Sequence, residues 1–162
     1  MSRTLVRLSL VCVLRVFIAP SGMAQLPNPY GASIAVENAK KVAAAAVAEA
    51  RKNNWTMAFA IVDPGGSLVY FEKMDGTQTG SVNVAQEKAK SAALFKRPTK
   101  AFQDVVAGGG VGLRILGLEG AVPVDGGVPI VMDGKIVGAI GASGGTSDQD
   151  GQCATAGANA VK

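Results

Sequence analysis

Two nearly apolar runs flank a single Asp133-Gly134 pair within residues 126–141. An Asp-Gly pair in this setting is a strong signal for a β-hairpin, because a type I′ turn requires positive φ at both central residues. Glycine adopts positive φ without steric cost, and aspartate tolerates it. Both arms are apolar at nearly every position, whereas a strand with one solvated face would alternate. We therefore predict two central strands, each covered on both faces.

A second hairpin is predicted between residues 55 and 73. Residues 55–62 are apolar, and residues 68–73 form a return strand. The intervening residues 63–67 read Asp-Pro-Gly-Gly-Ser, which are the residue types that favour a turn. Two hairpins in one chain indicate a sheet that is at least partly antiparallel.

Helical segments surround the two hairpins. Residues 34–52 are alanine-rich with apolar positions near helical spacing, and Ser33 is placed to cap this helix. Further helices are predicted at residues 81–95, 99–106 and from 147 to the C-terminus. Ser147 and Asp150 resemble a capping box at the start of the last one. The order predicts one α+β domain, an antiparallel sheet with helices packed on it.

The first 24 residues have the pattern of a secretory signal peptide. Arg3 and Arg7 precede an apolar run at residues 8–19, and small residues stand before Gln25. We therefore expect a signal peptide at 1–24, a mature domain at 25–162, and a periplasmic or secreted protein. The alternative is a cytosolic protein whose start site lies further downstream.

Charge and composition narrow the classes of function. Three of the 16 basic residues lie in the first 24 positions, so the remaining 13 nearly balance the 12 acidic residues. A near-neutral domain without a basic run gives no electrostatic footprint for nucleic acid. The chain has no histidine, which excludes Ser-His and Cys-His nucleophilic pairs. No catalytic constellation is recognisable, which favours a binding protein over an enzyme. A catalytic pair of carboxylates formed by two of the 12 acidic residues is the alternative that stays open.

The best candidate site residues follow the helix predicted at 81–95. Lys96 and Arg97 stand before a proline, where cations favour the helix dipole. They would equally suit the carboxylates of a bound ligand. Thr99 is either the cap of the next helix or a member of the same ligand-binding corner.

A glycine-rich segment, residues 107–118, supplies a second candidate. It is either a mobile loop or a lid that lets backbone approach a ligand closely. Glu119 and Asp125 flank the start of the hairpin at 126–141 and would line a pocket together with this segment. These two acids complete the set of candidate ligand-binding residues.

Several motifs together resemble the GlcG/HbpS family. They are Val62-Asp63-Pro64-Gly65-Gly66, Glu87 to Ala92 with Phe95 to Thr99, Gly126 to Ile130, Asp133-Gly134, Gly138 to Gly141, Ser143 to Gly145 and Asp148 to Asp150. The resemblance covers about residues 29–162. It implies a profilin-like three-layer sandwich, assembly into homo-oligomers, haem binding as in several relatives, and a link to redox sensing as in at least one.

The absence of histidine bears on that implied haem site. Haem iron would need another protein ligand, such as a hydroxyl oxygen, a tyrosine, a methionine or a cysteine. The candidates are Tyr30, Tyr70, Met57, Met74, Met132 and Cys153.

Three hypotheses therefore stand. The first is an exported haem- or tetrapyrrole-binding protein that acts in haem or iron handling or in redox sensing. The second is an enzyme or accessory protein that acts on a small hydroxy acid, whose carboxylate Arg97 would bind. The third is a structural subunit whose glycine- and alanine-rich helices pack against other copies.

Overall fold

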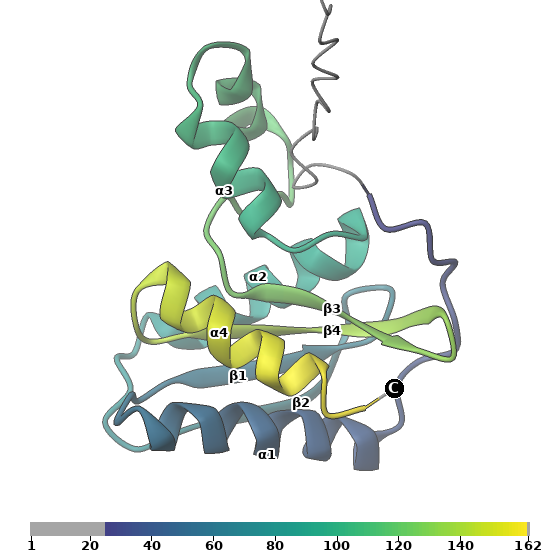
Figure 1. Ribbon diagram of the computed structural model, residues 1–162, viewed down its shortest axis with the longest axis vertical. Coiled ribbons are helices and arrows are strands. Elements are labelled where there is room, and N and C mark those ends of the chain that lie inside the picture. The colour runs from purple at the N-terminus through teal and green to yellow at the C-terminus, as the bar shows by residue number, and fades with distance from the viewer. Residues whose placement is uncertain (1–24, 162) are drawn as a thin grey trace, which may run out of the picture.

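The computed structural model describes residues 25–161. Its elements follow the predicted order of helix, hairpin, helices, hairpin and helix (Figure 1). They are α1 (Val36–Lys52), β1 (Ala58–Val62), β2 (Leu68–Lys73), α2 (Ser81–Phe95), α3 (Lys100–Ala107), the 3₁₀ helix η1 (Gly110–Gly117), β3 (Gly127–Met132), β4 (Lys135–Ser143) and α4 (Ser147–Ala158). Within residues 25–161, none of the helices has the length and apolar character that crossing a membrane requires. The signal peptide predicted at 1–24 lies outside the described residues.

The four strands form one antiparallel sheet in the order β2-β1-β4-β3. Helix α2 covers one face, and α1 and α4 lie together on the other (Figure 1). The predicted α+β architecture with three layers is confirmed. Helices α3 and η1, residues 100–117, project away from these layers, and we call this segment the arm.

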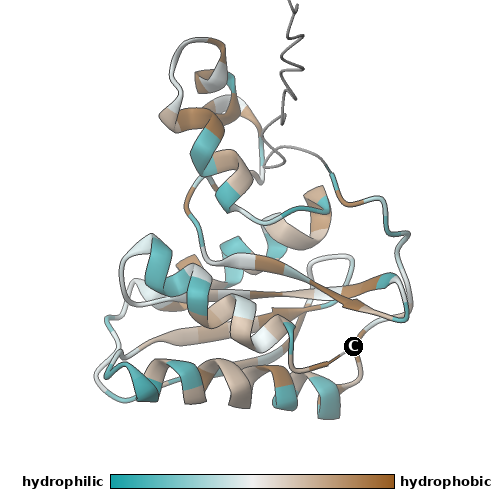
Figure 2. Cartoon of the chain, in the orientation of Figure 1, coloured by the Kyte–Doolittle hydropathy of each residue, from teal (hydrophilic) through white to brown (hydrophobic). Residues whose placement is uncertain are grey.

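The two faces of the sheet differ in the size of their side chains. In β1, Phe59 and Ile61 belong to the core that faces α1 and α4, whereas Ala58 and Ala60 face α2. The neighbouring strand β4 also has a small residue on the face toward α2, because its Gly141 pairs with Ala60. Small residues on one face let α2 approach the sheet closely, and large residues on the other fill the wider space under two helices. Hydrophobic residues accordingly run along the strands (Figure 2).

The hairpin of β3 and β4 has the predicted turn, but only one of its strands is central. Asp133 and Gly134 have φ of 47° and 71°, as a type I′ turn requires. Strand β4 lies between β1 and β3, whereas β3 lies at the edge. The prediction of two central strands was therefore wrong for β3. Pro129 suits that edge, because proline has no N–H to donate to a further strand.

Two predicted helix starts also differ from the structure. Helix α1 begins after Ala35, and the Ser33 hydroxyl donates to the carbonyl of Ile34 instead of capping. Helix α4 does have a capping box, formed one residue earlier than predicted by Thr146 and Gln149. That pair fits the rule better, since it places glutamine rather than aspartate at the third helical position.

Candidate functional site

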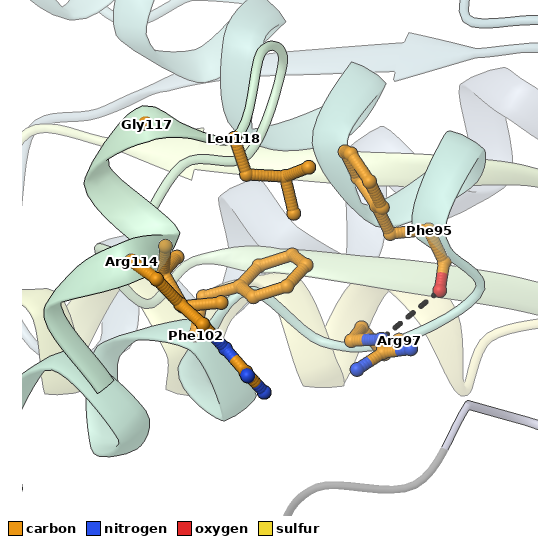
Figure 3. A pocket seen from close by; sticks show the side chains of 7 residues that line it. Phe95, Arg97, Phe102, Arg114, Gly117 and Leu118 are labelled. Atoms are coloured by element: carbon orange, nitrogen blue, oxygen red, sulfur yellow. Dashed lines mark hydrogen bonds between the residues drawn. The ribbon is translucent and has the colours of Figure 1, made fainter. Parts of the chain in front are cut away.

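A pocket of about 360 Å³ lies between the C-terminal end of α2 and the arm (Figure 3). This volume is within the range of small-molecule sites, roughly 300–1,000 Å³. Its lining combines two aromatic rings, aliphatic groups and two guanidinium groups. The lining residues are Phe95, Arg97, Phe102, Arg114, Ile115, Gly117 and Leu118.

Local backbone geometry places Arg97 at this pocket. Helix α2 ends because Lys96 adopts a left-handed conformation with φ of 51°, and Pro98 prevents the helix from continuing. The Nε of Arg97 donates to the carbonyl of Phe95 at 3.1 Å, and its guanidinium carbon lies 5.4 Å from the centroid of the Phe102 ring. These contacts orient a half-buried guanidinium beside the pocket.

The apolar wall is formed across two elements. Phe95 ends α2 and Phe102 lies in α3, and their rings meet edge to face with centroids 5.3 Å apart. Leu118 follows η1 and points toward these rings (Figure 3). Exposed Arg114 of η1 supplies the second guanidinium. An apolar wall with two cations beside it can hold a flat apolar molecule that carries carboxylates.

Of the five candidate residues predicted from the sequence, Arg97 alone lines this pocket. The Nζ of Lys96 lies 5.3 Å from the centroid of the Tyr30 ring. Thr99 is fully buried, and its hydroxyl accepts a hydrogen bond from the N–H of Gly127 at 2.9 Å. The N–H of Thr99 donates back to the carbonyl of Gly127 at 2.9 Å. Thr99 thus links the start of the arm to the edge strand β3 through two hydrogen bonds.

The two predicted acids lie apart from each other. Glu119 is exposed in the turn that follows η1. Asp125 is buried, accepts a hydrogen bond from the N–H of Gly126 at 2.6 Å, and has its own N–H bound by the side chain of Gln103 at 2.8 Å. Burial raises the pKa of the Asp125 carboxyl above its ordinary value, against the opposing effect of the Gly126 N–H. Neither acid lines the pocket.

The six side chains considered as iron ligands all lie elsewhere. The Tyr30 hydroxyl donates to the carbonyls of Ala93 and Leu94 at 2.9 and 3.1 Å. The other five belong to the core between the sheet and helices α1 and α4 or pack against it: Met57, Cys153, Tyr70, Met74 and Met132. Within residues 25–161, no group of three His, Cys, Asp or Glu side chains is placed to hold a metal ion.

Sequence reasoning missed Arg114, Phe102 and Leu118. The glycine-rich segment at 107–118 carries the signal for two of these residues, and the structure forms most of it as the 3₁₀ helix η1. An arginine inside an otherwise apolar run, Gly110 to Gly117, marks a cation carried next to apolar surface. Its distance from Arg97 along the chain hides the fact that the two share one pocket.

Comparison with known proteins identifies relatives of this chain. A family model described as "Haem degrading protein HbpS-like" matches residues 34–159. The chain belongs to the HbpS-like family. Protein GlcG of Escherichia coli K12 is 39% identical over 105 residues, which cover 65% of this chain and 77% of GlcG. An uncharacterised 15.0 kDa protein of Citrobacter freundii is 35% identical over 121 residues, which cover 74% of this chain and 85% of that protein.

Solved structures of HbpS and of PduOC share the fold of this chain. The crystal structure of HbpS matches with a TM-score of 0.74 and 28% identity, over 84% of this chain and 95% of that one. A double mutant of HbpS from Streptomyces reticuli gives a TM-score of 0.73 and 27% identity, over 93% and 99%. The haem complex of PduOC gives a TM-score of 0.71 and 28% identity, over 80% and 96%.

Proposed function

We propose that this HbpS-like protein binds haem or a related tetrapyrrole in the pocket between α2 and the arm. The observation that carries the proposal is the presence of two guanidinium groups, Arg97 and Arg114, around a pocket with aromatic and aliphatic walls. The family description and the haem complex of the PduOC relative support this choice of ligand.

The pocket matches the organic part of haem group by group. Burying the flat macrocycle against the partly exposed Phe95 and the exposed Leu118 removes apolar surface from water. Its two propionates would accept charge-assisted hydrogen bonds from Arg97 and Arg114, which are among the stronger hydrogen bonds in proteins. Bound haem would supply redox chemistry at its iron, and the protein side chains named here would bind and orient the ring.

The wider role within this proposal is haem or iron handling, or redox sensing, outside the cytoplasm. The export part rests on the pattern of residues 1–24. Redox sensing would depend on the bound tetrapyrrole rather than on Cys153, because burial raises the pKa of that thiol to about 12. Cell fractionation with and without residues 1–24 tests the location, and retention of both forms in the cytoplasm would contradict export.

An absorbance titration with hemin tests the proposed site. We expect saturable binding by the domain from residue 25 onward, and a loss of affinity of about tenfold or more in Arg97→Ala and in Arg114→Ala, since each removes a charged hydrogen-bond donor. Arg51→Ala is the matched control, because Arg51 is an exposed arginine of α1 outside this pocket. Equal affinity of all four proteins would place the haem elsewhere.

The second candidate function is action on a small hydroxy acid. The observation in its favour is again Arg97, which would bind the carboxylate of a small molecule as well as that of a large one. The apolar wall makes the larger ligand the better fit, since a small hydroxy acid would leave much of the apolar lining of the pocket in contact with water. Calorimetric titration with lactate separates the two, because binding of lactate without binding of hemin would favour the second.

We also propose that copies of this chain assemble into a homo-oligomer through the arm. Every residue of η1 stays at least partly exposed, and four of the exposed residues on or next to η1 are large and apolar: Val111, Leu113, Leu116 and Leu118. Hydrophobic residues on the projecting arm are visible in Figure 2. A patch of this kind is typical of a surface that another protein covers.

A further inference from the structure

The pocket fits the organic part of haem but not its iron. Its seven lining residues are phenylalanine, arginine, isoleucine, leucine and glycine. None of these side chains is a haem-iron ligand, a role that proteins give to histidine, cysteine, methionine or tyrosine. We infer that this site recognises a porphyrin dicarboxylate through its ring and its carboxylates, independently of the metal, so that metal-free porphyrin binds as well as haem. The inference rests on the proposed function and specifies its ligand class.

The position of the sheet excludes most candidate iron ligands from the site. The pocket begins at the C-terminal end of α2, which covers one face of the sheet. Met57, Cys153, Tyr70, Met74 and Met132 belong to or pack against the core on the opposite face. A side chain on that face would have to pass through a layer of paired backbone to reach a ring held at Phe95 and Phe102.

Tyr30 is the last of the six named candidate iron ligands, and its chemistry disfavours coordination. Its hydroxyl already donates to the carbonyls of Ala93 and Leu94. Iron binds the phenolate form of tyrosine, whereas two carbonyl acceptors hold the proton on the oxygen. Desolvation raises the pKa of Tyr30, which also favours the protonated hydroxyl over the phenolate. Tyr30 therefore acts as a neutral donor that holds the chain before α1 against the end of α2.

The charged side chains that line the pocket favour anionic ligands. Arg97 and Arg114 lie among the lining residues, and none of the other five is acidic. Figure 3 shows both guanidinium groups close to the Phe102 side chain, at the same pocket. Two cations beside one apolar wall match a ligand with two carboxylates on one edge of a flat ring.

The test compares three ligands that differ at one feature each. The protein from residue 25 onward is titrated with hemin, with metal-free protoporphyrin IX and with protoporphyrin IX dimethyl ester, whose carboxylates are blocked. We expect dissociation constants for hemin and protoporphyrin IX within about threefold of each other, and a loss of about tenfold or more for the ester. Arg114→Ala should weaken hemin and protoporphyrin IX by the same factor, and Arg51→Ala should weaken neither.

The outcomes separate this inference from the proposed function. If hemin binds and protoporphyrin IX binds more than about tenfold more weakly, the iron has a ligand, from this chain or from a second copy, and the inference is overturned while haem binding stands. If the dimethyl ester binds as well as the free acid, recognition of the carboxylates is overturned. If none of the three ligands binds, the proposed function itself fails.

Discussion

At the scale of single residues, Lys88 is the most unusual feature of the described chain. It lies on α2 with its side chain 1% exposed, and its Nζ is 2.7 Å from Oδ2 of Asp150 and 3.2 Å from the carbonyl of Ala142. Lysine is almost never buried without a partner. The ion pair joins α2, β4 and α4 across the end of the sheet. Asp150 also accepts from the N–H of Gly145 at 3.0 Å, so the buried carboxylate is well satisfied.

Breaking this ion pair should destabilise the fold. Lys88→Met or Asp150→Asn leaves one buried charge without its counter-charge, and we expect either change to lower the free energy of unfolding by roughly 3–5 kcal/mol. Urea denaturation measures the effect. Lys100→Met is the control, because its ion pair with Asp104 is exposed and should have little influence. A small loss in the Lys88 variant would show that the pair is dispensable.

Asp125 should make stability depend on pH in the acid range. Burial raises its pKa in the folded protein above the ordinary value of 3.8. Its contribution to stability is therefore fully present below pH 3.8 and is lost as pH rises through the raised value. Asp125→Asn removes this loss, so we expect its stability relative to the unsubstituted protein to improve toward neutral pH. Urea denaturation at several pH values checks this, and parallel profiles would contradict it.

At the scale of elements, contact between α2 and β4 depends on the absence of a side chain. A Cβ at Gly141 would clash with the carbonyl oxygen of Ala85 and would lie 2.6 Å from the N of Ala89. Both atoms belong to the backbone of α2 and cannot move away alone. Glycine is thus required at this position by the close approach of the helix, and not by its φ angle.

Gly141→Ala should therefore separate α2 from the sheet. We expect a loss of about 1–3 kcal/mol in the free energy of unfolding, because overpacking a tight contact forces backbone to shift. Thermal and urea denaturation measure it. Gly80→Ala is the control, since a Cβ at Gly80 meets nothing within 4 Å. Equal stability of the two variants would mean that the layers have more freedom than the structure shows.

At the scale of the whole molecule, the arm carries apolar side chains that the core of the three layers does not cover. Val111 and Leu116 are 77% and 64% exposed on η1, away from the three layers. Covering such residues removes them from water, which favours association of copies. The arm also lines the pocket, so assembly and ligand binding would use neighbouring surfaces.

Charged substitutions on the arm should prevent assembly. We expect light scattering to show an oligomer for the protein from residue 25 onward, and Val111→Asp with Leu116→Asp to shift it toward monomer, because a buried unpaired carboxylate is costly. Val36→Asp is the control, since Val36 is also exposed but lies in the first turn of α1. A monomer before substitution would overturn the proposed assembly.

The sequence by itself determined the local structure of this protein. The turn at Asp133-Gly134, the break after Phe95 and the order of elements follow from neighbouring residues whose backbone preferences are local. The motifs also identified the family, which the family model matches over residues 34–159. These features were predictable because they depend on residues close together in the chain.

Only the tertiary structure decided which distant residues meet. Strands β3 and β4 have similar apolar patterns, yet one is an edge and the other central, because pairing with β1 is a long-range choice. The presence of Arg97 and Arg114 at one pocket depends in the same way on how the arm lies against the end of α2. The sequence could name six possible iron ligands, but the sheet places five of them in or against the core on its far side. A sheet separates what lies on its two faces, and no pattern along the chain records which face a distant residue will reach.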